Sequence, residues 1–115
     1  MADCLFCRIV AGEIPAKIVR RTADAVAFND INPQAPVHLL VIPTTHVASV
    51  RAATGAEGER VLGRTLAFAA EMARDLGIDA NGYRIVTNTG PYAGQTVDHL
   101  HFHLLGGRKL GWPPG

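Results

Sequence analysis

The sequence predicts an α+β fold: a largely antiparallel, five-stranded sheet with one long and one short helix. Two observations carry this prediction. Five segments are apolar with the alternation or short β-branched runs typical of strands, whereas only one long segment has a helical period. Long connections separate most of the strand segments, and a single major helix does not suffice for a doubly wound parallel sheet.

Length, composition and charge limit the functions that this chain can have. Its 115 residues suit one domain over residues 1–115, and 18% charged residues is ordinary for a globular protein. A net charge of +1 without a basic run argues against binding to nucleic acid or an anionic membrane. Arg8 and Glu13 interrupt the N-terminal apolar residues, which argues against a signal peptide. No stretch approaches the ~18 apolar residues of a membrane span. We therefore expect a cytoplasmic protein.

The first three elements are short. Residues 4–11 predict a helix that carries Cys4 and Cys7 on adjacent turns. Residues 16–21 and 25–30 predict two strands around a tight turn.

A central strand comes next. Prolines fix a loop before it. Residues 37–43 are apolar on both faces and rich in β-branched side chains, as expected of a strand inside a sheet. Pro43 ends this strand because proline has no N–H to donate.

The long helix is expected over residues 56–76. Its apolar stripe consists of Leu62, Leu66, Ala69, Ala73 and Leu76, flanked by Val61, Phe68 and Met72. Thr54 and Glu57 fit a capping box at its start, and Gly77 suits its C-terminal end. Gly58 and Gly63 each disfavour the helix by up to ~1 kcal/mol.

The last two strands are expected over residues 83–88 and 97–105, with a glycine-containing loop between them. The final strand holds three of the five histidines, His99, His101 and His103, at alternate positions. Alternate residues of a strand share a face, about 6.6–6.8 Å apart. The leucines and phenylalanine between them then face the long helix, and the row of imidazoles forms a site.

Two interpretations of this row remain open from the residues alone. Histidines on a strand can bind zinc, since neutral imidazole is a common zinc ligand. Alternatively, one histidine acts as nucleophile or general base while its neighbours hold it and its substrate. The loop over residues 89–96 can offer backbone N–H groups to an anion, although it matches neither a P-loop nor a dinucleotide-binding fingerprint.

The C-x-x-C pair, Cys4 and Cys7, also has two interpretations. A thioredoxin-type redox motif requires a preceding strand, and none precedes this pair. The cysteines are either two buried thiols or half of a structural zinc site, for which His46 and His99 are the best-placed further ligands. Asp30 stands at the end of a predicted strand, where a carboxylate can accept hydrogen bonds from two vicinal hydroxyls or simply stabilise a local turn.

Several segments resemble one known family. HLHFHLL (99–105) matches the alternating motif of the histidine triad (HIT) nucleotide-binding proteins. The resemblance extends over EIPAKIV (13–19), AFNDINPQAPVHLLVIPTTH (27–46), GYRIVTNTG (82–90) and GQTVDHLHFHLLGGRKLGWPPG (94–115). The terminal GGRKLGWPPG is similar to the adenosine 5′-monophosphoramidase branch rather than to the dinucleoside-polyphosphate hydrolases or uridylyltransferases.

This resemblance implies a HIT-like fold whose sheet extends across a homodimer. It also implies cleavage of the P–N bond of purine nucleoside 5′-phosphoramidates, which gives AMP or GMP and an amine. His101 would be the nucleophile and form a nucleotidyl-histidine. His103 would contact the phosphate oxygens, His38 would support the histidine hydrogen bonds, and Thr96 would donate to the phosphate or leaving group.

The resemblance further implies a nucleotide pocket. Its residues would be Phe6, Ile9, Phe28, Asn29, Asp30, Ile31, Asn88, Gly94, Gln95, Thr96, His101 and His103. The phenylalanines and isoleucines would wall the purine, and Asp30 would bind the ribose hydroxyls. Asn88 would lie near the phosphate, and Gly94 and Gln95 would bring the loop backbone close.

Some bacterial-type members of the family carry a structural zinc, which catalysis does not require. Cys4, Cys7, His46 and His99 occupy the corresponding places in this sequence. Trp112 would reach the leaving-group pocket of the partner subunit. The chain departs from the animal enzymes at Asn29, where they have histidine, and at Asp98, where they have tyrosine.

Two other functions remain open from the sequence. One is a nucleotide-binding or scaffolding protein in which catalysis is incidental. The other is a metallohydrolase in which His99, His101 and His103 all bind a catalytic metal.

Overall fold

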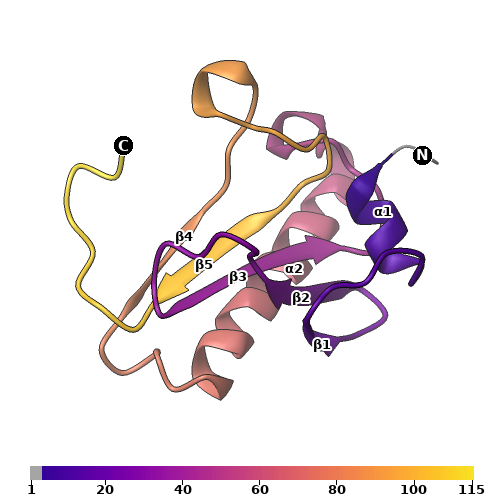
Figure 1. The fold of residues 1–115 in the computed structure, drawn as a ribbon. Coiled ribbons are helices and arrows are strands. Elements are labelled where there is room, and N and C mark those ends of the chain that lie inside the picture. The colour runs from indigo at the N-terminus through magenta and orange to yellow at the C-terminus, as the bar shows by residue number, and fades with distance from the viewer. Residues whose placement is uncertain (1–3) are drawn as a thin grey trace.

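In the described part of the chain, one antiparallel sheet separates a short helix from a long one (Figure 1). The computed structural model describes residues 4–115. Its strands are β1 (Ile18–Arg21), β2 (Ala25–Asn29), β3 (Val37–Pro43), β4 (Tyr83–Val86) and β5 (Phe102–Gly106), arranged in the order β1-β2-β3-β5-β4. The helices are α1 (Leu5–Val10) and α2 (Gly55–Asp75), with short 3-10 turns η1 (Val50–Ala52) and η2 (Pro91–Ala93). Every neighbouring pair of strands is antiparallel, so the predicted fold class is confirmed.

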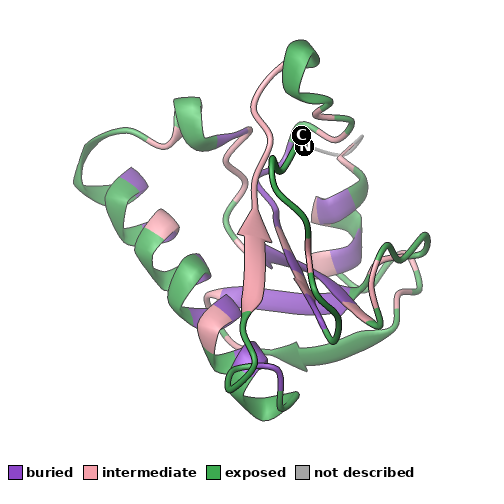
Figure 2. Ribbon diagram, turned by 90° about the vertical axis from the view of Figure 1, so that its left-hand side faces the viewer, coloured by how far each residue is buried: buried purple, intermediate pink, exposed green. Residues whose placement is uncertain are grey.

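The side chains of the sheet alternate between two apolar clusters, one under each helix. The α2 side contains Ala25, Ala27, Leu39, Val41, Phe102 and Leu104. The α1 side contains Val26, Phe28, Leu40 and Ile42, with Phe6 and Ile9 of α1. Figure 2 shows the buried residues on the sheet and on the sides of the helices that face it. β3 is buried along almost its whole length, as predicted for the central strand.

The register of β3 and β5 places two histidines on the α1 side of the sheet. His38 pairs with Leu105, and His103 pairs with Leu40. Directly opposed residues of an antiparallel ladder point to the same face. His38 and His103 therefore share the face of Leu40, beside the six residues of α1. Because α1 is so short, it covers only part of this face.

α2 buries Ala69 and Ala73 of the predicted stripe, but Thr65 takes the place of Leu66. Thr65 is buried, whereas Leu66 is 44% exposed. The hydroxyl of Thr65 donates to the carbonyl of Val61 at 2.7 Å, which removes the cost of burying it. Leu76 is also exposed, and the side chain of the N-cap residue Thr54 makes no capping hydrogen bond. The predicted stripe and capping box were therefore partly wrong.

β5 begins at Phe102 rather than at residue 97, so His99 and His101 precede the hydrogen-bonded strand. Pro43 at the end of β3 has no N–H to extend the ladder, and its carbonyl accepts from Nε2 of His99 at 2.9 Å. The N–H of Leu100 donates to the carbonyl of Val47 instead. The predicted alternation survives from Leu100 onward, because Leu100, Phe102 and Leu104 all face α2.

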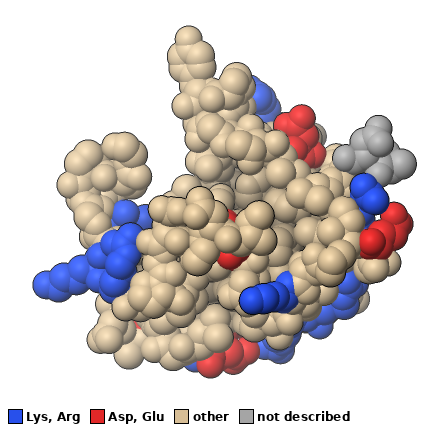
Figure 3. Space-filling model, viewed as in Figure 1, with Lys and Arg blue, Asp and Glu red and all other residues tan. Residues whose placement is uncertain are grey.

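No helix in the described part of the chain is both long enough and apolar enough to cross a lipid bilayer. Charged side chains of both signs lie mostly around the rim of the face seen in Figure 3. This view agrees with the low net charge of the sequence.

Gly58 is required by close packing at the start of α2. A Cβ at this position would lie 2.3 Å from the carbonyl carbon of Ala53, whereas a Cβ at Gly63 would meet nothing within 4 Å. We expect Gly58→Ala to lower the free energy of unfolding by roughly 1–3 kcal/mol, because the backbone must shift. The matched variant Gly63→Ala should raise it by about 0.5–1 kcal/mol. Urea denaturation measures both, and equal effects of the two variants would contradict the packing argument.

Candidate functional site

The three alternating histidines divide between two neighbouring clusters. His99 is fully buried and lies with Cys4, Cys7 and His46, whereas His103 lies with His38 and Asp30. The ring of His101 lies between them, with its centroid 5.3 Å from that of His103. Among residues 4–115, no group of converging ligand atoms contains all three histidines. The geometry therefore does not favour one metal ion bound by the whole row.

The cysteine cluster joins α1 to the segments that follow β3 and precede β5. Nδ1 of His99 lies 3.4 Å from Sγ of Cys4 and 3.5 Å from Sγ of Cys7. Nδ1 of His46 lies 3.2 Å from Sγ of Cys7. All four potential ligand atoms lie within 4.8 Å of one another. α1 presents both thiols together because Cys4 is its N-cap residue and its sulfur accepts from the N–H of Cys7.

This donor set fits a zinc ion. Tetrahedral zinc, about 2.3 Å from sulfur and about 2.0 Å from nitrogen, separates these ligands by about 3.5 Å. Nε2 of His99 must carry the proton because it faces the Pro43 carbonyl, so its Nδ1 lone pair points at the thiols. Burial raises the pKa of the Cys7 thiol, and the adjacent Cys4 raises it further. A divalent cation compensates for both effects by stabilising the thiolates.

His101 is held in a single tautomer. Its Nδ1 lies 2.7 Å from the backbone carbonyl of His99, so Nδ1 donates the proton and Nε2 of the neutral ring keeps the lone pair. The backbone carbonyl of His101 accepts from the hydroxyl of Thr87 at 2.9 Å. The edge of the Phe6 ring packs against the His101 ring with centroids 5.1 Å apart. Backbone and side chain are therefore both fixed.

His38 and His103 form a directed hydrogen-bonded pair. The N–H of Gln34 donates to Nδ1 of His38 at 3.0 Å, which leaves the proton of the neutral ring on Nε2. The Nε2–H of His38 in turn donates to Nδ1 of His103 at 2.9 Å. Neutral His103 consequently carries its own proton on Nε2. Oδ2 of Asp30 lies 3.4 Å from Nε2 of His38, and its Oδ1 accepts from the N–H of Asn32 at 2.8 Å.

Burial makes this pair hard to protonate. It lowers the pKa of His38, and the Asp30 carboxylate opposes that shift. Burial also lowers the pKa of His103, with further lowering by His101 and His38 and an opposing effect of Asp30. Both rings therefore favour the neutral form in the folded protein.

Two hollows meet at His38 on the open part of this face. One is lined by residues 15–17, by Asn29 at the end of β2 and by Asp30 and Ile31 of the loop that follows. The other brings Asn88 together with His103 and with the side chains of Arg84 and Arg108. Asn29, Asp30, Asn88, His38 and His103 thus surround neighbouring spaces, as a shared ligand site requires.

The remaining predicted residues differ in their placement. Phe6, Ile9 and Phe28 are buried together in the apolar cluster beneath α1, whereas Ile31 is fully exposed on its loop. Gly94 has a left-handed backbone, and Thr96 and Asp98 are exposed. The side chain of Gln95 turns inward and bonds Ala48, Val97 and Gly90, so it orders the loop itself. Trp112 is 82% exposed, under the guanidinium of Arg84.

The contacts that fix the histidine tautomers were not predicted from the sequence. Gln34 and Pro43 act through backbone atoms, which leave no signal in the residue type. Thr87 had a signal, since it follows β4 immediately beside the predicted Asn88. Arg84 and Arg108, which line the hollow at His103, stand within the segments that resemble the family but carried no assigned role.

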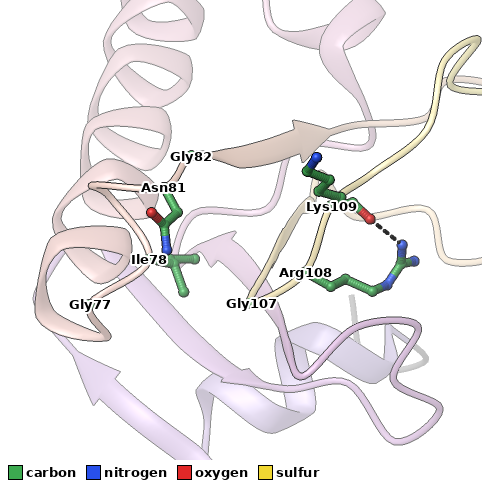
Figure 4. A pocket seen from close by; sticks show the side chains of 7 residues that line it. All are labelled: Gly77, Ile78, Asn81, Gly82, Gly107, Arg108 and Lys109. Atoms are coloured by element: carbon green, nitrogen blue, oxygen red, sulfur yellow. Dashed lines mark hydrogen bonds between the residues drawn. The ribbon is translucent and has the colours of Figure 1, made fainter.

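Another hollow lies beyond the C-terminal end of β5, away from the histidines (Figure 4). It is lined by Gly77, Ile78, Asn81, Gly82, Gly107, Arg108 and Lys109. The adjoining Gly106 has a packing role, because a Cβ there would lie 2.7 Å from Cδ1 of Ile78. None of the predicted site residues lines this hollow, and the site chemistry lies elsewhere.

Comparison with known proteins identifies the family. The HIT domain matches residues 11–110, so the chain belongs to the HIT family and the resemblance seen in its sequence is confirmed. It is 45% identical over 109 residues to the purine nucleoside phosphoramidase of Escherichia coli K12, covering 95% of this chain and 91% of that protein. It is 51% identical over 113 residues to an uncharacterized HIT-like protein of Synechococcus elongatus, covering 98% and 97% of the two chains.

Solved structures agree with this assignment. The crystal structure of a HIT family hydrolase from Legionella pneumophila has a TM-score of 0.94 and 45% identity, covering 98% of this chain and 100% of that one. A HIT family hydrolase from Clostridium thermocellum has a TM-score of 0.91 and 44% identity, covering 96% of each chain. The arrangement of strands and helices is therefore that of the family.

The buried histidine pair predicts a loss of stability on acidification. In the unfolded chain histidine has a pKa of about 6.5, above the lowered pKa of both folded rings. As the pH falls below about 6.5, the unfolded chain binds more protons than the folded one, so the free energy of unfolding decreases. We expect the double variant His38→Gln, His103→Gln to lose less stability than the unmodified protein between pH 7.5 and 5.5. Urea denaturation in the presence of a chelator measures this, and identical pH slopes would contradict it.

Proposed function

We propose that this protein hydrolyses purine nucleoside 5′-phosphoramidates to AMP or GMP and an amine, or transfers the nucleotidyl group, with His101 as nucleophile. The observation that carries the proposal is the 2.7 Å hydrogen bond from Nδ1 of His101 to the His99 carbonyl, which leaves the Nε2 lone pair available. Further support comes from the 45% identity to the phosphoramidase of Escherichia coli. We take residues 1–115 as one HIT domain.

The reaction has two displacements. Nε2 of His101 attacks the α-phosphorus, an N–P bond forms, and the amine leaves with the electron pair of the original P–N bond and takes up a solvent proton. Water then attacks the phosphorus, and the N–P bond breaks with its electron pair returning to Nε2. The water loses a proton to solvent and its oxygen stays on the nucleotide. A covalent intermediate thus divides one difficult substitution into two easier ones.

His103 binds the phosphate, and His38 supports it. The tautomer set by Gln34 and His38 leaves the proton of neutral His103 on Nε2, and we assign this N–H to a phosphate oxygen. His38 positions His103 and keeps that donor in place. The exposed hydroxyl of Thr96 is the proposed further donor to the phosphate or leaving group.

The nucleotide would lie across the hollows that meet at His38. Asp30 keeps unused lone pairs after its contacts with Asn32 and His38, so its carboxylate can accept from the ribose hydroxyls. Asn88 is assigned to the phosphate side. The remaining proposed contacts are Phe6, Ile9, Phe28, Asn29 and Ile31 around the base and Gly94 and Gln95 in the loop.

We further propose a structural zinc ion at Cys4, Cys7, His46 and His99. When bound, zinc would stabilise the two thiolates and fix α1, with no direct part in catalysis. We also propose a homodimer in which β4, at the edge of the sheet, continues into the partner's sheet. Trp112 would then approach the partner's leaving-group pocket.

Replacement of the nucleophile provides the main test. We expect His101→Ala to lower turnover of an adenosine phosphoramidate with a fluorogenic amine by roughly 10³-fold or more. Turnover by the unmodified protein should persist after EDTA treatment, and quenching in an alkaline denaturant, which preserves the acid-labile N–P bond, should trap a nucleotide covalently bound to it but not to the variant.

Other outcomes would favour other functions. Full activity of His101→Ala would exclude it as nucleophile. Activity lost with EDTA and restored by metal, in protein that stays folded, would favour a metallohydrolase. No turnover of any phosphoramidate, despite binding of AMP, would favour a nucleotide-binding protein.

The zinc proposal has a separate test. The double variant Cys4→Ser, Cys7→Ser should lose stoichiometric zinc because hydroxyls replace both thiolate ligands. Metal analysis after purification measures this, with the unmodified protein expected to carry one zinc per chain. A variant that retains the full amount would disprove the site.

A further inference from the structure

The cysteine cluster and the nucleophile share a residue. The side chain of His99 reaches the two thiols, while its backbone carbonyl accepts the hydrogen bond that fixes His101. A shift of residue 99 therefore moves the acceptor that holds the nucleophile in its tautomer. Nε2 of His99 is hydrogen-bonded to the Pro43 carbonyl, so the polar contacts of its other ring nitrogen, Nδ1, are those with Cys4 and Cys7.

Phe6 provides a second connection between the two sites. It stands between Cys4 and Cys7 on α1, and its ring contacts both histidines edge-on. The ring centroids lie 5.9 Å from His99 and 5.1 Å from His101, at interplanar angles of 73° and 86°. The Phe6 side chain is only 4% exposed, so its place follows that of the helix that carries it.

α1 has too few residues to be stable alone. Six residues are far below the ~12–15 at which an isolated helix becomes even marginal. Its position depends on the apolar contacts of Phe6 and Ile9 and on the cysteine cluster at its N-terminal end. Metal binding would add a second anchor to α1, and Phe6 would transmit that constraint to the His101 ring.

We infer that metal binding at Cys4, Cys7, His46 and His99 tightens nucleotide binding, and that Phe6, itself a proposed contact to the base, joins the two sites. The inference rests on the proposed nucleotide site. Thermodynamic coupling is reciprocal, so a bound nucleotide tightens metal binding by the same factor. Loss of metal then weakens the nucleotide site without removing any residue that touches the substrate's phosphate.

Calorimetry with AMP tests this inference on the metal-free and the zinc-loaded full chain. We expect zinc to tighten AMP binding by roughly 5- to 100-fold, the usual range for coupled sites. A competition titration with a zinc chelator, with and without AMP, should give the same factor. Equal AMP affinity with and without zinc would overturn the inference alone. If AMP bound in neither state, the proposed nucleotide site would fail, and the inference with it.

Variants identify the residue that carries the coupling. Phe6→Leu should reduce the zinc-dependent ratio of AMP affinities towards one, whereas Phe6→Tyr keeps the ring and should retain it. Ile42→Val trims the same apolar cluster from β3 and should leave the ratio unchanged, which separates coupling through Phe6 from general packing. An unchanged ratio in Phe6→Leu would overturn the role of Phe6. If Phe6→Leu fails to fold, a ratio lost in Phe6→Tyr would overturn that role.

Discussion

The hydrogen bond from Nε2 of His99 to the carbonyl of Pro43 determines how the histidine segment is used. It occurs where β3 ends and before β5 begins, so residues 99–101 are held by contacts other than the sheet ladder. The bond fixes the His99 tautomer and turns Nδ1 towards the cysteines. The backbone carbonyl of His99 remains free to accept from His101. One constraint thus orders a thiol-imidazole cluster and the proposed nucleophile together.

The sheet supplies the remainder of the site through its register. Pairing of β3 with β5 places His38 and His103 on the face beside α1, and the 2.9 Å hydrogen bond between them follows from that placement. The opposite face is filled by α2 and its apolar contacts. Because α1 has only six residues, the face beside it stays partly open. A long helix on one side and a short one on the other therefore give a rigid support and an accessible site.

Much of the fold was predictable because its signals are local. The double-sided apolar run at 37–43 and the helical period at 56–76 identify the central strand and α2 in the sequence. The alternating histidines likewise indicate a site. Alternation alone, however, assumes a strand that continues, and it cannot show that Pro43 accepts from His99. The burial of Thr65 in place of Leu66 was equally unpredictable from the sequence, because it depends on a hydrogen bond within α2. Backbone partners such as Gln34 became visible only with the fold.

The central claim is that backbone and side-chain contacts give each buried histidine a fixed tautomer and thereby divide the row into two sites. Nitrogen-15 NMR of the imidazole rings in the metal-free protein near pH 8 tests it directly. The account predicts that His101 carries its proton on Nδ1, with an unprotonated Nε2, while His38 and His99 carry theirs on Nε2. A His101 ring protonated on Nε2 would contradict the account, because its nucleophilic lone pair would then point at the His99 carbonyl.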